Sequence, residues 1–370
     1  MILITSAAYV TPGLASEFGK LPPCMLPVQN RRLYEHQVAI VPEGESVVLS
    51  LPQSYTLTGY DKKRLSTLGV TVVKSPDELS LGQSVVYVLN VLGKYNEPVG
   101  IFHGDTLFSS LIDTKDVCAV AQAEDDYDWA DANKYDRTIY AGYFAFSDQS
   151  LLIQKITENS YKFIAGVDEY SKVKSLQQVV LPNWMDFGIS NTYYRSMSKM
   201  TTQRVFNSMK VTRYSVRKSS KDKRKMDAEA NWILSLPHQM KHYAPALWDK
   251  GEDEERGFYE IEYYFLSSLA NLFVFGKNKP YVWDEIISAC VEFLNDEAQF
   301  KPKDAETIAR HNDQLYSAKT LQRLYTYSQQ SGISLERPFR INGIEVPSIR
   351  QIIDEIEPML TKEDTRFATL

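Results

Sequence analysis

The first half of the chain alternates short β-rich runs with helix-like segments, and this alternation constrains the fold more than any other feature. The strand-like runs are residues 2–4, 47–51, 70–73, 99–103 and 117–122. The segments between them have helix-forming patterns at residues 31–38, 60–68 and 83–92. This order predicts an α/β fold, a Rossmann-like, mostly parallel sheet covered by helices. Because ligands of such sheets bind at the carboxyl ends of the strands, the loops that follow strands are the places to look for chemistry.

Further segments extend this domain and begin a second one. In the first domain we expect strands at 140–146 and 161–166, an exposed acidic loop at 124–136 and a helix at 192–207. From about Lys210 we expect an α+β unit, with strands at 212–217, 258–266 and 269–275 around an amphipathic helix at 223–236. Helices at 283–294, 303–330 and 349–360 follow. The expected domains are therefore residues 1–209 and 210–370, which suits a chain of 370 residues.

Composition narrows the class of protein. Apolar residues make up 44% and charged residues 24%, as in ordinary soluble globular proteins. The net charge of −6 argues against a nucleic-acid partner, which usually requires a basic surface. No apolar run approaches the roughly 20 residues of a membrane span, so no membrane insertion is expected. The three cysteines are far apart and odd in number, which favours a reducing, cytoplasmic location without a disulfide framework.

A carboxylate follows one of the buried strands. Asp105, preceded by Gly104, comes directly after residues 99–103 and is expected at the carboxyl edge of the sheet, where Mg²⁺ bound to phosphates could be held. Asp186 lies 81 positions later, in Trp184-Met185-Asp186-Phe187-Gly188. It is either the second metal ligand or a residue that caps the turn before Gly188. Only folding can bring the two aspartates together.

The opening strand, Leu26-Pro27-Val28 and the following Arg31–Gln37 segment resemble the sugar-phosphate nucleotidyltransferase family. The resemblance implies a nucleoside triphosphate, CTP or UTP, and a sugar or polyol phosphate as substrates. It also implies Mg²⁺ at Asp105 and Asp186. The sugar-phosphate oxygen would attack the α-phosphorus, and pyrophosphate would leave.

The same resemblance assigns the binding loops. It places the phosphates at Ser6 and Ala7 and the base at the turn containing Gly82. The chain departs from the family in two ways: the glycine-rich loop is replaced by Ser6-Ala7-Ala8-Tyr9-Val10, and Pro23 stands where the family has a lysine. Lys20, Arg31 or Arg32 would replace that lysine, and we expect Lys20 to be catalytic.

The second half resembles part of a small-molecule kinase. Lys218 at a strand end and Glu229 in the next helix resemble the lysine–glutamate pair with which aminoglycoside-phosphotransferase-like kinases hold ATP. The fusion resembles capsular polysaccharide biosynthesis proteins. A kinase His-Gly-Asp loop is missing after Phe275, because the only such triplet is His103-Gly104-Asp105. We therefore expect either that the chain continues past Leu370 or that this domain has lost its catalytic half.

These patterns leave three hypotheses. The first is a nucleotidyltransferase that activates a sugar or polyol phosphate for capsule or surface-polysaccharide synthesis. The second is a nucleotide- or sugar-binding scaffold without catalysis. The third is one part of a bifunctional kinase and nucleotidyltransferase. Small-molecule partners are expected in each case, and a homo-oligomer is left open.

Overall fold

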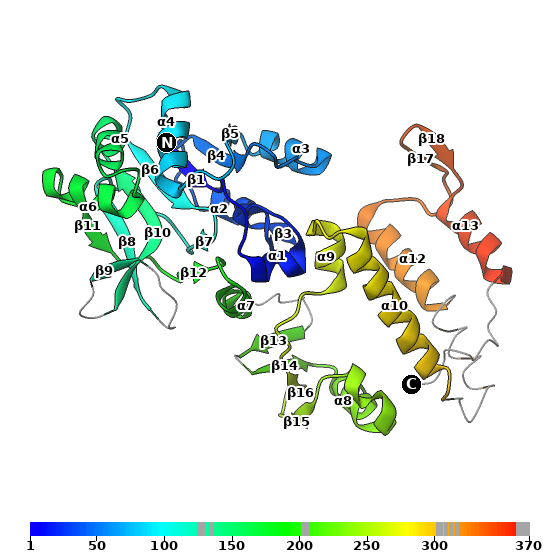
Figure 1. The fold of residues 1–370 in the computed structure, drawn as a ribbon. Helices are drawn as coiled ribbons and strands as arrows, with labels where there is room; N and C mark the ends of the chain where they lie inside the picture. Colours follow the sequence, from blue (N-terminus) through cyan, green and yellow to red (C-terminus); the bar gives the residue numbers. More distant parts are fainter. Residues whose placement is uncertain are drawn as a thin grey trace. The chain divides into compact units, whose positions relative to one another are not determined.

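The computed structural model describes residues 1–123, 130–133, 137–200, 207–212, 214–300, 306, 310, 314 and 318–359 (Figure 1). The chain divides into two compact units. One comprises Met1–Met226 and Trp248–Pro280, and the other comprises Asp227–Leu247 and Tyr281–Leu370. These bounds do not coincide with the expected boundary between residues 209 and 210, which stays a prediction.

The described part of the first unit contains an eight-stranded mixed sheet, with the strand order β11-β8-β10-β6-β1-β4-β5 and β9 paired to β10. Strands β5, β4, β1 and β6 run parallel, as do β11 and β8, whereas β10 is antiparallel to β6, β8 and β9. The mostly parallel α/β fold is therefore confirmed. The strands are β1 (Ile2–Thr5), β4 (Val47–Pro52), β5 (Thr71–Ser75), β6 (Val99–His103), β8 (Val117–Gln122), β9 (Asp131–Asn133), β10 (Thr138–Phe146) and β11 (Gln177–Val179).

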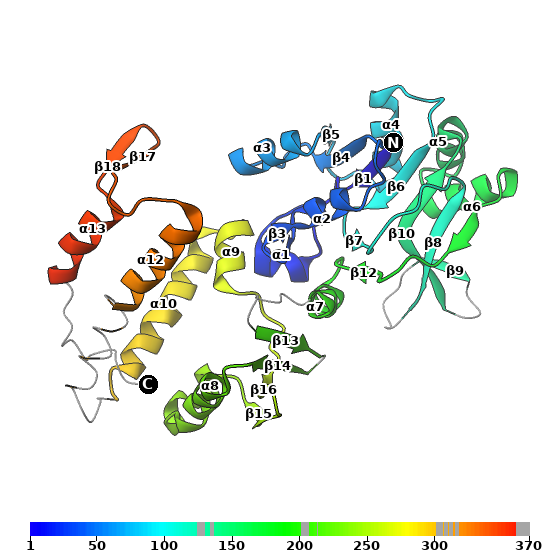
Figure 2. The same cartoon turned by 180° about the vertical axis from the view of Figure 1, so that it is seen from behind.

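Helices cover both faces of this sheet because successive strand residues point to opposite sides (Figure 2). Leu3 and Ile101 belong to one buried cluster, whereas Ile4 and Phe102 belong to the other. The helices of the first cluster are α4 (Leu81–Leu92), α5 (Gln149–Glu158) and α6 (Phe163–Val173). Those of the second are α1 (Pro12–Phe18), α2 (Leu33–Ala39), α3 (Gly59–Thr67) and α7 (Ser190–Lys199).

The strand expected at 161–166 is wrong, because this segment enters α6. Phe163, Val167 and Tyr170 are buried, and their spacing of four and three residues forms one face of a helix. The helix expected at 192–207 is α7, which ends at Lys199. Of the loop expected at 124–136, residues 124–129 and 134–136 lie outside the described residues, and β9 takes up 131–133.

A smaller four-stranded sheet follows in the chain, with the order β13-β14-β16-β15. Its strands are β13 (Asn207–Val211), β14 (Ser215–Ser220), β15 (Leu247–Glu252) and β16 (Gly257–Glu262), and α8 (Lys223–Ser235) follows β14. An added Cβ on Gly257 would lie 2.9 Å from the Cα of Lys223, so the start of α8 lies directly against β16. The expected α+β character of this segment is confirmed.

The strand expected at 269–275 is also wrong, because the structure has helix α9 (Leu269–Phe275) there. The hydroxyl of Ser268 accepts a hydrogen bond from the amide of Asn271 and so caps the first turn of this helix. Residues 263–266, expected in the preceding strand, lie beyond the end of β16.

The remaining elements belong largely to the second unit. They are η2 (His238–Tyr243), α10 (Pro280–Glu297), α12 (Lys319–Ser331), β17 (Phe339–Ile341), β18 (Ile344–Val346), α13 (Ile349–Ile356) and η4 (Glu357–Met359). Helices near 283–294 and 349–360 are thus confirmed as far as residue 359. Of the helix expected at 303–330, residues 319–330 lie in α12, and most of the residues before α12 lie outside the described ones. Across the described helices, none has the length and apolar character that crossing a membrane requires.

Candidate functional site

The fold brings Asp105 and Asp186 together. Two short strands, β7 (Thr106–Leu107) and β12 (Met185–Asp186), pair antiparallel and place Asp186 opposite Thr106. The amide of Phe187 donates a 2.7 Å hydrogen bond to the carbonyl oxygen of Asp105. An added Cβ on Gly188 would lie 3.1 Å from Oδ2 of Asp105 and 3.3 Å from Oδ1 of Asp186. Both carboxylates therefore adjoin the same glycine.

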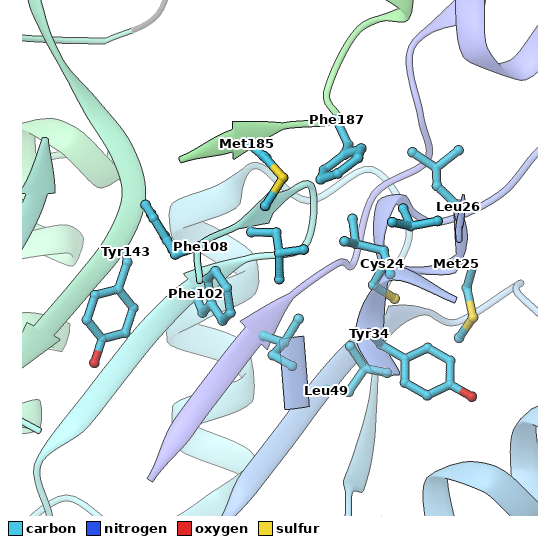
Figure 3. Packing of buried hydrophobic residues seen from close by; sticks show 14 of the residues in the cluster. Cys24, Met25, Leu26, Tyr34, Leu49, Phe102, Phe108, Tyr143, Met185 and Phe187 are labelled. Carbon is cyan, nitrogen blue, oxygen red and sulfur yellow. The ribbon is translucent and has the colours of Figure 1, made fainter. Parts of the chain in front are cut away.

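The residues on either side of Asp186 explain its orientation. Met185 and Phe187 are buried in the cluster that contains Phe102 and Phe108 (Figure 3). Because neighbouring side chains of an extended segment point to opposite sides, burial of these two turns Asp186 away from the cluster. The hydroxyl of Ser196 donates a 2.7 Å hydrogen bond to the carbonyl oxygen of Asp186, which connects the strand to α7.

The Asp186 carboxylate has only part of its hydrogen-bonding capacity filled. Its Oδ1 accepts a 3.3 Å hydrogen bond from the amide of Gly188, which agrees with the turn-capping interpretation. Its Oδ2 is buried and has no hydrogen-bond partner among the described residues. Burial, and then the neighbouring Asp105 carboxylate, raise the pKa of Asp186 to about 7. A buried carboxylate beside a second one is costly to ionise, and a cation between them would offset that cost.

The loop that carries Asp105 is held by a residue that sequence reasoning missed. Gln37 is fully buried on α2, and its Nε2 donates hydrogen bonds to the carbonyl oxygens of His103 (2.9 Å) and Thr106 (2.8 Å). These bonds fix both ends of the turn around Gly104 and Asp105. The available signal was one glutamine directly after Glu35 and His36 in a short helix, which does not reveal its partners.

His103 packs beneath the same turn. Its ring centre lies 5.9 Å from that of Phe144 and 6.0 Å from that of Phe163. Burial lowers the pKa of this histidine. The hydrophobic surroundings therefore favour a neutral imidazole in this position.

Gly104 connects the Asp105 turn to the loop after β1. Its amide donates a 2.8 Å hydrogen bond to the carbonyl oxygen of Thr5, and an added Cβ would lie 2.7 Å from the Cβ of Ser6. Only glycine allows so close an approach. The hydroxyl of Ser6 accepts a 3.0 Å hydrogen bond from the amide of Cys24, and the Ser6 amide donates to Ser50 Oγ at 3.1 Å. The structure thus gives Ser6 a connecting role, while its binding of phosphate stays a prediction.

The residues that follow Ser6 line a cavity of about 230 Å³. It lies beyond the carboxyl ends of β1, β4 and β5, and its lining residues are Ala7, Ala8, Tyr9, Lys20, Pro52, Asp77, Glu78 and Leu79. The ammonium of Lys20 lies 4.2 Å from the centre of the Tyr9 ring, a cation–π contact. The hydroxyl of Tyr9 is 2.6 Å from that of Ser54. Two predicted site residues, Ala7 and Lys20, therefore meet in this cavity.

Three other predicted residues lie elsewhere. Gly82 is buried in the first turn of α4, where an added Cβ would lie 2.1 Å from the carbonyl oxygen of Tyr161. This close packing accounts for a glycine at position 82, and its contact with a base stays a prediction. Lys218 is on β14 in one unit, with its Nζ 5.5 Å from the centre of the Tyr259 ring, and Glu229 is on α8 in the other. Their joint role in ATP binding stays a prediction.

The donor set suits Mg²⁺ bound together with a phosphorylated substrate. Over the ranges that the structure describes, no group of three or more His, Cys, Asp or Glu side chains is placed to hold a metal ion. Mg²⁺ commonly takes one or two carboxylates and completes its coordination with water and substrate phosphates. The Asp105 and Asp186 carboxylates meet this requirement, and the unpartnered Oδ2 of Asp186 supplies a vacant lone pair.

Comparisons with solved structures find nucleotidyltransferases that cover about half of the chain. A nucleoside-diphosphate-sugar pyrophosphorylase from Vibrio cholerae is 15% identical and covers 53% of this chain and 99% of its own, with a TM-score of 0.45. A putative glucose-1-phosphate thymidylyltransferase from Bacillus anthracis is 15% identical, covering 55% and 96%, with a TM-score of 0.40. The inositol-1-phosphate CTP transferase from T. maritima is 16% identical, covering 54% and 95%, with a TM-score of 0.39.

No family model matches the chain, and no curated protein does. Identities near 15% with TM-scores below 0.5 establish no shared activity, so any functional assignment has to come from the site itself.

Proposed function

We propose that this protein is a nucleotidyltransferase that joins a nucleoside triphosphate to a sugar or polyol phosphate. The observation that carries the proposal is the Asp105–Asp186 pair, with its buried, unpartnered carboxylate oxygen at the carboxyl edge of the sheet. A nucleotide would extend from the cavity to this pair of aspartates, because one loop borders both places. The loop after β1 contacts Gly104 through Ser6 and lines the cavity through Ala7 and Tyr9.

The cavity accounts for only part of the nucleotide. Ligand pockets typically measure about 300–1,000 Å³, and this one is about 230 Å³. We therefore assign it to the base, with the phosphates extending towards Asp105 and Asp186. The Lys20 ammonium at the cavity wall supplies positive charge to the phosphates or the leaving group, since it can swing from the Tyr9 ring on its flexible stem.

In the proposed reaction an oxygen of the sugar phosphate forms a bond to the α-phosphorus. The bond from that phosphorus to the β-phosphate oxygen breaks, and pyrophosphate leaves with its electron pair. Asp105 and Asp186 would hold Mg²⁺, which supplies charge neutralisation for the phosphates. The protein positions Asp105 through Gln37, whose two hydrogen bonds fix the Asp105 turn, and it positions Asp186 through the pairing of β12 with β7. The protein itself needs little acid–base chemistry, because the attacking phosphate oxygen is already ionised.

The test is pyrophosphate release in the presence of Mg²⁺, each of the four ribonucleoside triphosphates and a panel of sugar and polyol phosphates. Asp105→Asn and Asp186→Asn should each lower the rate by about 100-fold or more, as expected when charge stabilisation is lost. Asp113→Asn is the matched control, because this exposed aspartate forms a surface ion pair with Lys115, and such pairs contribute little. Full activity in Asp105→Asn would refute the assigned role.

A second candidate function is a nucleotide-binding scaffold without turnover. It is favoured by the loop after β1, where the amide and hydroxyl of Ser6 are both engaged within the protein, and by Pro23, which begins a short 3-10 turn (Pro23–Met25). A rise in melting temperature with nucleotide, but no pyrophosphate with any acceptor, would favour this candidate. Three further proposals rest on the sequence alone: surface-polysaccharide synthesis, ATP binding by Lys218 and Glu229, and oligomer formation.

A further inference from the structure

We infer that the cavity selects a nucleobase with an exocyclic amino group, and that the carboxylate of Glu78 accepts a hydrogen bond from that group. The inference rests on the proposed function, which places a base in the cavity. It narrows the substrate from any nucleotide to those whose base is cytosine, adenine or guanine, and it disfavours uracil and thymine.

Of the two carboxylates in the cavity lining, Glu78 is the one available to bind a ligand. It is exposed, and within the described part of the chain it makes no hydrogen bond and no ion pair. Its backbone adopts a φ of +66°, a left-handed conformation that is uncommon for residues other than glycine.

The neighbouring Asp77 is already engaged. Its Oδ1 accepts a 3.2 Å hydrogen bond from the amide of Ser54. The Ser54 hydroxyl and the amides of Ser54 and Gln53 lower the pKa of Asp77. Since Ser54 also contacts the hydroxyl of Tyr9, Asp77 holds the wall of the cavity in place. Asp77 is therefore a positioning residue, and Glu78 is the acceptor available to a ligand.

The lining favours a neutral aromatic ring over a phosphate. One ammonium, that of Lys20, faces two carboxylates, so the lining is net negative and repels phosphate groups. Tyr9 offers an aromatic surface, while Pro52 and Leu79 add apolar contact. An ionised carboxylate can only accept hydrogen bonds. Cytosine and adenine offer it an amino donor at N4 and N6, and guanine offers its 2-amino group. Uracil and thymine have only oxygens at their exocyclic polar positions, and these acceptors would be repelled.

The experiment measures equilibrium binding of CTP, ATP, GTP and UTP to the full chain by calorimetry, with Mg²⁺ and no acceptor. We expect the amino-bearing nucleotides to bind about tenfold more tightly than UTP, because a site that bonds one polar group rejects the analogue lacking it. Glu78→Gln should reduce this preference to about threefold or less, since its amide can donate to O4 of uracil as well as accept. Glu43→Gln is the control, because Glu43 is also exposed and makes no described hydrogen bond.

The outcomes are separable. Equal binding of all four nucleotides would overturn the inference and leave the proposed function intact. A preference for amino-bearing bases that persists in Glu78→Gln would overturn the role of Glu78. Failure of every nucleotide to bind would sink the proposed function, and the inference with it. A preference that is lost in Glu78→Gln and kept in Glu43→Gln would support the inference.

Discussion

Replacing Asp186 by asparagine should make the metal-free protein more stable, and the gain should grow with pH. Burial and the Asp105 carboxylate raise the pKa of Asp186 from its ordinary 3.8 to about 7. Between these two values the folded protein holds a proton that the unfolded chain has lost. Stability therefore falls as the pH rises from about 4 to about 7 and then levels off, because the folded state binds more protons.

The size of the effect follows from the shift. A rise of about 3 pKa units, at about 1.36 kcal/mol per unit, corresponds to about 4 kcal/mol above pH 7. At pH 5 only part of this cost is present, about 2 kcal/mol. Asparagine keeps the shape of the side chain and does not titrate, so Asp186→Asn should be more stable than the native protein by about these amounts.

The measurement is urea unfolding of the native protein and Asp186→Asn at pH 5 and pH 8, in the presence of EDTA. Asp113→Asn serves as the control, since its exposed carboxylate should change stability little at either pH. Adding Mg²⁺ at pH 8 should stabilise the native protein and not Asp186→Asn. If native and variant proteins show the same pH dependence, Asp186 is not a strained carboxylate and the argument for a cation between it and Asp105 fails.

Two further changes test the packing that supports the site. Arg32→Met should lower the free energy of unfolding in urea by about 3–5 kcal/mol, because it leaves the fully buried Asp61 without its ion pair. If the unpaired charge is the cause, the double variant Arg32→Met/Asp61→Leu should recover much of that loss. Gly82→Ala should lower the melting temperature, because the added methyl would overlap the carbonyl oxygen of Tyr161. Gly59→Ala is the control: its added methyl meets nothing within 4 Å, so the melting temperature should stay within about 2 °C of the native value. Equal melting temperatures for the two alanine variants would contradict the packing role of Gly82.

Local sequence patterns predicted most of the central sheet. The apolar runs at 47–51 and 99–103 are short, β-rich and bounded by polar segments, so burial on both faces requires strands there. The same patterns failed at 161–166 and 269–275. Both segments are aromatic and β-prone, yet Phe163 and Phe275 are buried from helices, because their tertiary neighbours outweigh a weak local preference.

For the site, the sequence by itself determined that Asp105 follows a buried strand and therefore lies at the carboxyl edge of the sheet. Only the tertiary structure decided that Asp186 is beside it, since the pairing of β7 with β12 joins segments 81 residues apart. The sequence did not reveal the cavity either, because its walls come from four separate segments of the chain: residues 7–9, Lys20, Pro52 and residues 77–79. The physical reason is that burial follows local apolar periodicity, whereas a pKa, an unpartnered oxygen or a cavity depends on distances between segments that no local pattern encodes.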